Sequence, residues 1–550
     1  MRADYTPEPE TINAMFRGLV KRHDARIAID YRDATITYQS LGQRAAQIAN
    51  ALIARGIGEG KTVALYMPNS AFHPMLFFGA LLAGARVTHL SPLDAMAELA
   101  FKCRDSEARI LFCPAAEPFR DMAIRLLAEG AVQEIVLCDE ALAFGAGPSA
   151  QEQESSALLP VGAHRLDALL AGVSETMPDV IVAPESIALL QYTGGTTGRA
   201  KAAILTHANL TAATRIYGAW FADDAAAGPQ AVVLVVLPLF HIMALVSILL
   251  RRLNEGACLV LHQRFDVEKT LDDIARKHIS GFSGVPTMWI ALVNVPDIAT
   301  RDLSSLASIG SGGAPLPIAI HNRIRALTGL DLRGGWGMTE TCAAGTNLPL
   351  VLPPGKEGSV GIPLPGISID IVAVDDATRI LPIGETGEIR IRAPNVTAGY
   401  WNRTEETAAA FHDGCFLTSD IGRMDQDGFL YLIDRKNDLI ISGGFNVYPQ
   451  TIENAVIEHP AVAEVLVIGV PDSYRGEAAK ACVVLRKDCP AFTLAELRYF
   501  LHGRLGRHEM PQHLVFRDIL PKTPVGKYSR KLLREQEMAL DATRSCTNGA

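Results

Sequence analysis

The segment Tyr192–Lys201, YTGGTTGRAK, has the composition of a phosphate-binding loop. Its three glycines allow positive φ angles and a close approach of the backbone to a ligand, and successive backbone N–H groups in such a turn form a concave anion site. Threonine hydroxyls add hydrogen-bond donors, and Lys201 adds a flexible positive charge. The segment is not a Walker P-loop, because Lys201 lies three residues after Gly198 and Ala202 follows it. These residue types favour a polyphosphate ligand, the alternative being an ordinary Gly/Thr surface turn.

Two further glycine motifs could bind a nucleotide. The first, residues 311–315 (SGGAP), follows a strand-like run, and the second is residues 335–340 (GWGMTE). The Trp336 ring could stack on a nucleobase, and the Glu340 carboxylate could hold Mg²⁺ against phosphate oxygens. In the alternative interpretation, SGGAP is a strand-to-helix turn, Trp336 is a core aromatic residue and Glu340 is a solvated helix start.

Three further motifs lie toward the C-terminus. The first carries an acidic side chain, the second a pair of glycines and the third a lysine. Asp420, in TSDIG, could accept both hydroxyls of a ribose, although an Asx turn would use the same residue. Gly443 and Gly444 lie in IISGGFNVYP, which could also be a plain interdomain connection. Lys527, in PKTPVGKYSR, would be presented on a turn after two prolines, the alternative being a solvated basic tail.

The elements that must position the first motifs alternate between helices and strands. Helices are predicted at residues 37–57, where apolar residues share one face and Gly56 follows as a stop, and at 74–83. Strands are predicted at residues 63–66, 86–90, 108–113, 135–138, 187–190, 231–237, 259–261, 281–284 and 308–310. Such alternation predicts a parallel, doubly wound sheet. Residues 141–180 lack periodicity and are predicted to lie outside the stable core.

After residue 355 the pattern changes to period two. Residues 368–374, 387–392 and 428–433 predict an antiparallel β unit. The charged run at residues 434–438 then predicts a domain linker. About a hundred residues follow, enough for a small domain, with strands expected at 462–470 and 481–485 and a helix at 494–505.

Composition excludes several classes of protein. The chain has 550 residues, 49% of them hydrophobic, and a formal net charge of −9, which argues against broad nucleic-acid binding. Its nine cysteines form no C-x-x-C pair, so free thiols in a reducing cytoplasm are expected. The apolar residues 231–250 could imitate a membrane span, but Pro238 and His241 in their middle favour a buried strand, a turn and a core helix. A homodimer and a peripheral membrane contact stay open.

In their order and spacing, the six motifs resemble those of the adenylate-forming (AMP-binding) superfamily, which includes acyl-CoA synthetases, peptide-synthetase adenylation domains and beetle luciferases. The resemblance extends from roughly residue 12 to 535. It implies an α/β fold in which a large N-terminal domain, with doubly wound α/β subdomains and an antiparallel β subdomain, precedes a small mobile α+β domain. The expected bounds are residues 1–434 for the AMP-binding domain, 435–439 for the hinge and 440–550 for the small domain.

The resemblance also implies roles in binding ATP and Mg²⁺. The β- and γ-phosphates would be held by Thr193, Gly194, Gly195, Thr196, Thr197, Gly198 and Lys201. Adenine would lie between Trp336 and the segment Gly312, Gly313 and Ala314. Thr339 would contact the α-phosphate, and Glu340 with Thr193 would hold Mg²⁺. Asp420 would bind the ribose, with Arg435 beside it.

The resemblance places catalysis in two steps. An acid and ATP would form an acyl-adenylate and pyrophosphate, with Lys527 bridging the carboxylate and the α-phosphate. The small domain would then rotate about the hinge, so that Gly443 and Gly444 line the channel for coenzyme A.

The sequence gives weaker signals for the identity of the carboxylic acid substrate. Gly194 stands where many members have serine, and the glycine form TGGTTG is similar to that of fatty acyl-CoA synthetases. His241 would line the acyl pocket. Small and apolar residues would shape the rest of it, namely Val285, Met288, Trp289, Ala343, Ala344 and Gly345. We therefore expect an AMP-forming acid–CoA ligase for a medium- or long-chain fatty acid. The alternatives are an aryl, cinnamate-type or dicarboxylate CoA ligase, an enzyme that loads an acyl carrier protein, and a catalytically silent nucleotide-binding protein.

Overall fold

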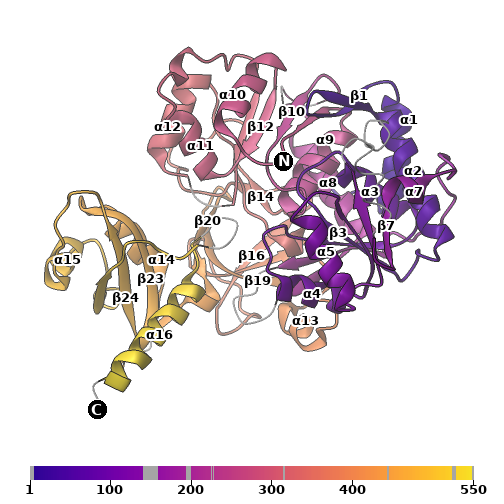
Figure 1. Ribbon diagram of the computed structural model, residues 1–550. Coiled ribbons are helices and arrows are strands. Elements are labelled where there is room, and N and C mark those ends of the chain that lie inside the picture. Colours follow the sequence, from indigo (N-terminus) through magenta and orange to yellow (C-terminus); the bar gives the residue numbers. More distant parts are fainter. Residues whose placement is uncertain are drawn as a thin grey trace. The chain divides into compact units, whose positions relative to one another are not determined.

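The computed structural model describes residues 5–139, 159–193, 200–224, 226, 228–313, 316–442, 445–472, 474–522 and 528–547. The chain divides into two compact units (Figure 1). Unit 1 comprises Met1–Ser368 and Ile391–Phe416, and unit 2 comprises Ile369–Arg390 and Leu417–Ala550. The hinge at residues 435–439 and the domain bounds on either side of it stay predictions.

The first sheet of unit 1 has seven strands and carries the predicted phosphate loop at its edge. In spatial order they are β7 (Ala163–Arg165), β6 (Glu134–Cys138), β5 (Ala108–Pro114), β3 (Thr62–Tyr66), β4 (Arg86–Leu90), β8 (Ile187–Thr193) and β9 (Lys201–Thr206). All neighbours are parallel except β8 and β9, which form an antiparallel hairpin. Strands that are buried on both faces explain the continuous apolar runs of the sequence.

The second sheet of unit 1 has the same character. Its order is β13 (Ser308–Ser311), β12 (Gly281–Gly284), β10 (Val232–Val235), β11 (Cys258–Leu261), β1 (Ile27–Tyr31) and β2 (Ala34–Thr37). Only β2 runs antiparallel to its neighbour. The prediction of doubly wound parallel sheets is confirmed. A short pair, β14 (Thr346–Asn347) and β15 (Ile362–Pro363), lies outside both sheets.

The helices of unit 1 alternate with these strands along the chain. They are α1 (Ile12–His23), α2 (Tyr38–Ala54), α3 (Phe72–Leu82), α4 (Met96–Asp105), α5 (Phe119–Ala128), α7 (Leu166–Leu170), α8 (His207–Trp220), α9 (Arg251–Asn254), α10 (Val267–Arg276), α11 (Pro286–Val293), α12 (Ile318–Thr328) and α13 (Thr404–Ala410). Single turns are η3 (Ile298–Thr300) and η4 (Thr339–Thr341). Every residue of α3 is buried, which explains why its sequence is apolar on all sides.

The apolar residues 231–250 form β10, a turn and then a π-helical segment, η2 (Ala244–Leu250), as predicted. Across the described ranges, no helix combines the length and the apolar character needed to cross a membrane.

One prediction for unit 1 was wrong. Within residues 141–180, β7 is an edge strand that pairs with β6, and α7 buries Leu166 and Leu169. The strand escaped notice because it is short and contains His164 and Arg165, as edge strands often do. Residues 140–158 lie outside the described part of the chain.

Unit 2 contains most of an antiparallel sheet and a second, smaller sheet. The remaining elements of the chain are β16 (Ser368–Val372), β17 (Gly387–Arg392), β18 (Phe411–His412), β19 (Cys415–Met424), β20 (Leu430–Arg435), η5 (Lys436–Asp438), β21 (Ile440–Ser442), β22 (Phe445–Val447), α14 (Pro449–Val456), β23 (Val462–Asp472), β24 (Gly476–Leu485), α15 (Leu494–Leu501), β25 (His513–Phe516) and α16 (Arg530–Thr547). Of these, β18 belongs to unit 1, and β16, β17 and β19 cross the division between the units. β19 pairs antiparallel with both β18 and β20.

The smaller sheet of unit 2 has the order β22-β21-β24-β23, with β25 on β24. β23 and β24 form an antiparallel hairpin, whereas β24, α15 and β25 form a parallel βαβ unit. The expected α+β character is confirmed. The helix predicted to end at Leu505 ends at Leu501, because Gly503 takes a positive φ of 78°.

Candidate active site

The β8–β9 hairpin brings the two ends of the predicted phosphate loop together. Thr193 and Lys201 are register partners at its open end, and both side chains are half-buried. The loop between them, with Gly194, Gly195, Thr196, Thr197 and Gly198, lies outside the described residues. The hairpin therefore presents one hydroxyl and one ammonium at the same point, which fits a polyphosphate ligand.

A polar cluster fixes the end of β8 from behind. The Tyr192 hydroxyl donates to Asp105 Oδ2 at 2.8 Å and to the Lys102 carbonyl at 3.1 Å. Arg403 Nη2 lies 3.0 Å from the other carboxylate oxygen of Asp105. Burial, together with the hydrogen bond and charge of Asp105, raises the pKa of Tyr192, so the hydroxyl remains a donor. These contacts thus anchor Tyr192, the residue that precedes Thr193.

Glu340 is buried beside this hairpin. It lies in η4, which contacts both β8 and β9, and only 6% of its surface is exposed. The Tyr400 hydroxyl donates to Glu340 Oε1 at 2.9 Å, and Thr397 N donates to the Glu340 carbonyl at 2.7 Å. The alternative of a solvated helix start does not describe this residue. Thr339, its neighbour in η4, is half-buried.

These residues fit the expected Mg²⁺–ATP complex. Among the described residues, no group of three or more His, Cys, Asp or Glu side chains could hold a metal on its own. Mg²⁺ is usually bound by one or two carboxylates together with substrate phosphates, so Glu340 and the Thr193 hydroxyl would suffice with ATP present. The charged Lys201 Nζ lies 4.3 Å from the ring centroid of Tyr400, which places it near the same tyrosine that contacts Glu340.

Tyr400 is a residue that the sequence did not reveal as part of the site. It is 60 positions from Glu340 in the chain, and no local pattern joins the two.

The glycines of GWGMTE are required by close backbone contacts. A Cβ on Gly335 would lie 2.2 Å from the Thr346 carbonyl oxygen, and one on Gly337 would lie 2.0 Å from that of Ala343. Trp336 between them is 5% exposed and packs against Gly345. It is a core aromatic residue in this structure, and its stacking on adenine stays a prediction.

The SGGAP segment follows β13. Gly312 N donates to the Gly284 carbonyl at 3.1 Å, and Gly313 has a φ of 82°. A Cβ on Gly312 would lie 2.6 Å from the end of the Met243 side chain, so a glycine allows this contact. Ala314 lies outside the described residues.

The predicted turn before His241 is present and is held by a buried asparagine. Asn69 Nδ2 donates to the Leu237 carbonyl at 3.0 Å, and Leu239 N donates to Asn69 Oδ1 at 2.8 Å. The backbone N of His241 donates to the Pro238 carbonyl, and its side chain is exposed. Of the other predicted acid-pocket residues, Ala343 accepts a hydrogen bond from the Tyr217 hydroxyl at 2.6 Å.

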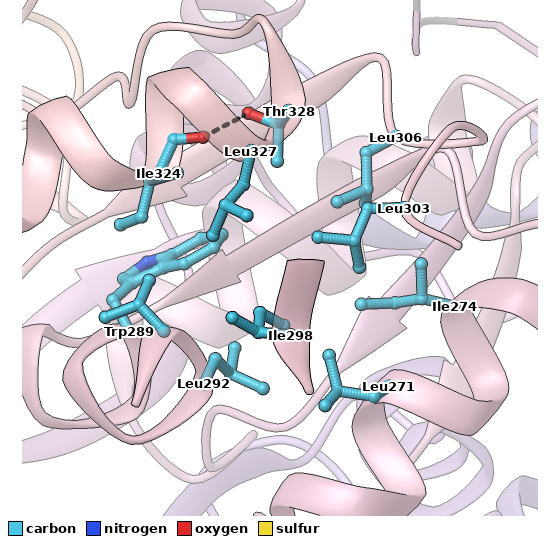
Figure 2. Close-up of a pocket in the computed structure, with 11 residues that line it drawn as sticks. Leu271, Ile274, Trp289, Leu292, Ile298, Leu303, Leu306, Ile324, Leu327 and Thr328 are labelled. Atoms are coloured by element: carbon cyan, nitrogen blue, oxygen red, sulfur yellow. Dashed lines mark hydrogen bonds between the residues drawn. The ribbon is translucent and has the colours of Figure 1, made fainter. Parts of the chain in front are cut away.

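A small cavity behind Trp289 is not the acid site. Its volume is about 20 Å³, and Figure 2 shows apolar side chains of α10, α11 and α12 around it, including Leu271, Leu292 and Leu327. That volume admits about one water molecule, whereas ligand pockets measure hundreds of cubic ångströms. Trp289 itself donates from Nε1 to the Gly310 carbonyl at 2.9 Å.

In unit 2, the two residues predicted to lie at the ribose, Asp420 and Arg435, are in contact with each other. Asp420 and Arg435 are register partners across β19 and β20, and Arg435 Nε lies 3.2 Å from Asp420 Oδ1. Asp420 is 7% exposed, and its backbone N donates to Thr418 Oγ1. Gly443, Gly444 and Lys527 lie outside the described residues, so their roles stay predictions.

The chain is similar to known proteins over most of its length. Residues 16–401 match the AMP-binding enzyme family, and residues 451–527 match the AMP-binding enzyme C-terminal domain. A long-chain-fatty-acid–CoA ligase of Bacillus subtilis (strain 168) is 34% identical over 538 residues, 96% of this chain and 95% of that protein. A feruloyl-CoA synthase of Amycolatopsis sp. is 34% identical over 509 residues, 92% and 95% of the two chains.

The chain is also similar to a solved structure that contains ATP. O-succinylbenzoate coenzyme A synthetase from Bacillus subtilis, in complex with ATP and magnesium ion, is 29% identical with a TM-score of 0.77, and the match covers 94% of this chain and 99% of that one. Both the large and the small part of the chain are thus matched in one protein. The chain belongs to the AMP-binding enzyme family and is an AMP-forming acid–thiol ligase that uses ATP, Mg²⁺ and coenzyme A.

Proposed function

We propose that this enzyme activates a medium- or long-chain fatty acid and transfers it to coenzyme A, with the site residues in the roles given below. The observation that carries these roles is the open end of the β8–β9 hairpin, where Thr193 faces Lys201 and the buried Glu340 lies alongside, linked to Lys201 through Tyr400. A hydroxyl, an ammonium and a carboxylate are the groups that a Mg²⁺–triphosphate complex needs.

In the first step, a carboxylate oxygen attacks the α-phosphorus of ATP, the bond to the β-phosphate breaks and pyrophosphate leaves. Lys201 would bind the outgoing phosphates, and Thr339 would contact the α-phosphate. Bound Mg²⁺ would neutralise charge on the phosphate oxygens. Holding the two anions in line supplies much of the rate, because it converts an encounter into an intramolecular step.

In the second step, the coenzyme A thiol attacks the acyl carbonyl, gives up its proton and releases AMP. Lys527 belongs to the first step, because a positive charge between the carboxylate and the α-phosphate is needed only there. A rotation of the small domain about residues 435–439 would withdraw Lys527 and bring Gly443 and Gly444 to the thiol channel.

The fatty acid is favoured by Gly194 and by the Bacillus subtilis relative. An aryl acid is the second candidate, because the equally similar Amycolatopsis relative is named a feruloyl-CoA synthase. His241, near the turn held by Asn69, would lie by the acid in either case.

The test is pyrophosphate release from ATP with a panel of fatty, aryl and dicarboxylic acids, each with and without coenzyme A. We expect acid-dependent release to be highest with a medium- or long-chain fatty acid, and a thioester to form only when coenzyme A is present. Higher activity with a cinnamic acid would replace the fatty acid by the second candidate. Accumulation of adenylate without any thioester would overturn transfer to coenzyme A and favour a carrier protein.

A further inference from the structure

The segment from Pro394 to Trp401 ties the two halves of the predicted Mg²⁺–ATP site together. At one end, Asn395 Nδ2 donates to the carbonyls of Thr341 and Ala344 at 2.6 and 2.9 Å. At the other end, Trp401 N donates to the Ala202 carbonyl at 2.9 Å. The segment therefore holds the turn that carries Glu340 against the strand that begins with Lys201.

Tyr400 lies at the centre of this connection. Its backbone forms an antiparallel bridge with Ala203, the second residue after Lys201, and its N donates to Thr407 Oγ1 at 2.9 Å. Gly399 permits this path, because a Cβ there would lie 2.6 Å from the Thr407 methyl group. The backbone of Tyr400 is thus held in place by contacts that do not involve its side chain.

The side chain of Tyr400 contacts both charged groups of the predicted site. Its hydroxyl donates to Glu340 Oε1 at 2.9 Å, and the Lys201 Nζ lies 4.3 Å from its ring centroid. The hydroxyl thus donates to the carboxylate, while the ring face attracts the ammonium.

We propose that Tyr400 is a positioning residue for Mg²⁺–ATP. It fixes one oxygen of Glu340, so that the carboxylate keeps a single orientation toward the metal, and its ring holds the Lys201 ammonium at the triphosphate. Such outer partners of metal ligands change metal affinity by 10- to 100-fold in other enzymes. The proposal rests on the roles of Glu340 and Lys201 in the proposed function.

Two substitutions separate the two contacts. Tyr400→Phe removes the hydrogen bond to Glu340 but keeps the ring beneath Lys201, whereas Tyr400→Leu removes both. Tyr38→Phe is the matched control, because Tyr38 is fully buried in the same unit and its hydroxyl donates to two carbonyls, those of Leu253 and Ala257, none of which belongs to the site.

The first readout is binding without turnover. The melting temperature of each variant is measured with ATP in EDTA and with ATP over a range of Mg²⁺ concentrations. For Tyr400→Phe we expect the Mg²⁺ concentration at half-maximal stabilisation to rise about 10-fold, with the response to ATP in EDTA unchanged. Tyr400→Leu should also weaken the response in EDTA, while Tyr38→Phe should lower the melting temperature and leave both responses as in the wild type.

The second readout is acid-dependent pyrophosphate release as a function of Mg²⁺ and ATP. Tyr400→Phe should raise the half-saturating Mg²⁺ by the same factor, and excess Mg²⁺ should restore its rate. If the half-saturating Mg²⁺ concentration of Tyr400→Phe equals that of the wild type and only the melting temperature is lower, Tyr400 has a purely structural role and the proposal is overturned. If the wild type released no pyrophosphate with any acid, the proposed substrate would fail, but the binding readout would still decide the role of Tyr400.

Discussion

Thr193 and Lys201 lie opposite each other as register partners where β8 ends and β9 begins. Their backbone positions are fixed by the hairpin, and Tyr192 is anchored to Asp105 immediately behind them. The two side chains would therefore reach the predicted phosphate site from a fixed backbone, which is a requirement for positional catalysis.

Replacing Lys201 by methionine should weaken ATP binding. The variant keeps an unbranched side chain of nearly the same length but loses the charge, and a hydrogen bond to a charged group contributes about 1.5–3 kcal/mol. We expect the KM for ATP in pyrophosphate release to rise by roughly 10- to 100-fold. The control is Lys61→Met, because Lys61 is an exposed residue of the same unit; an unchanged KM in Lys201→Met would remove Lys201 from the triphosphate site.

The fold of the protein follows from local patterns, whereas the contacts of the site do not. The apolar runs predicted β3, β4 and β5 to within a residue, because strands buried on both faces must be apolar throughout. The polar edge strand β7 lacks that signal and was missed.

The site motifs could be recognised in the sequence because a close backbone contact requires a glycine at that position, whatever lies on the other side of the contact. Gly335 and Gly337 lie against carbonyls that leave no room for a Cβ, so a pattern in the sequence records a backbone contact. The hydrogen bond from Tyr400 to Glu340 joins two segments by tertiary folding alone, and no spacing rule in the sequence predicts it.

Asp420→Asn should reduce the recognition of ribose. Asp420 is buried to 7% exposure next to Arg435, and a carboxylate accepts both hydroxyls of a ribose, whereas an amide offers a single acceptor oxygen. The wild type should prefer ATP to its 2′-deoxy and 3′-deoxy analogues, and the variant should lose about 10-fold of that preference. Pyrophosphate release with each nucleotide measures it, with the exposed Asp375→Asn as control; equal preference in both variants would exclude Asp420 from ribose binding.

Lys527→Ala should separate the two half-reactions. If Lys527 bridges the carboxylate and the α-phosphate, adenylation should fall by two or more orders of magnitude, on the order expected for removing one group that stabilises developing charge. Thioester formation from synthetic acyl-adenylate and coenzyme A should be retained. Lys522→Ala is the control, because Lys522 lies just before the same segment and pairs with Glu464 at 3.2 Å. Equal loss of both half-reactions would contradict the rotation of the small domain.

Arg530→Ala should destabilise unit 2. Arg530 binds Glu453 through two nitrogens, at 3.2 and 2.7 Å, and lies 3.1 Å from Asp438 and 3.4 Å from Asp434. Breaking a buried ion pair from one side costs about 3–5 kcal/mol, because the remaining charges are left uncompensated. Hydrogen exchange of β23 and β24 should report a loss of that size at pH 7.

The loss in Arg530→Ala should shrink in acid. Burial raises the pKa of Asp434 and of Glu453, and removing Arg530 would raise both further, so these carboxyls take up protons at a higher pH than free carboxyls do. Protonation then relieves the buried charge in the variant. Arg504→Ala is the control, because Arg504 forms an exposed pair with Glu458, and its effect should stay below about 1 kcal/mol at every pH.

His73→Leu should reduce the acid sensitivity of unit 1. His73 is fully buried in α3 and its ring stacks on that of His89, with the centroids 4.9 Å apart. Burial lowers the pKa of His73 and lowers that of His89 to about 4. Since the unfolded chain binds more protons than the folded one below about pH 6.5, stability is complete above that pH and falls as the pH drops toward about 4.

Removing one of the two imidazoles should flatten this dependence by up to about 1.4 kcal/mol per pH unit. Within the described part of the chain, neither ring nitrogen of His73 has a hydrogen-bond partner, so leucine of similar volume sacrifices no bond seen there and the variant should fold at pH 7. Urea unfolding monitored by tryptophan fluorescence reports unit 1, because Trp220, Trp289, Trp336 and Trp401 all belong to it. His513→Gln, an exposed change in unit 2, should leave the slope unaltered, and an unchanged slope in His73→Leu would show that His73 is already protonated in the folded protein.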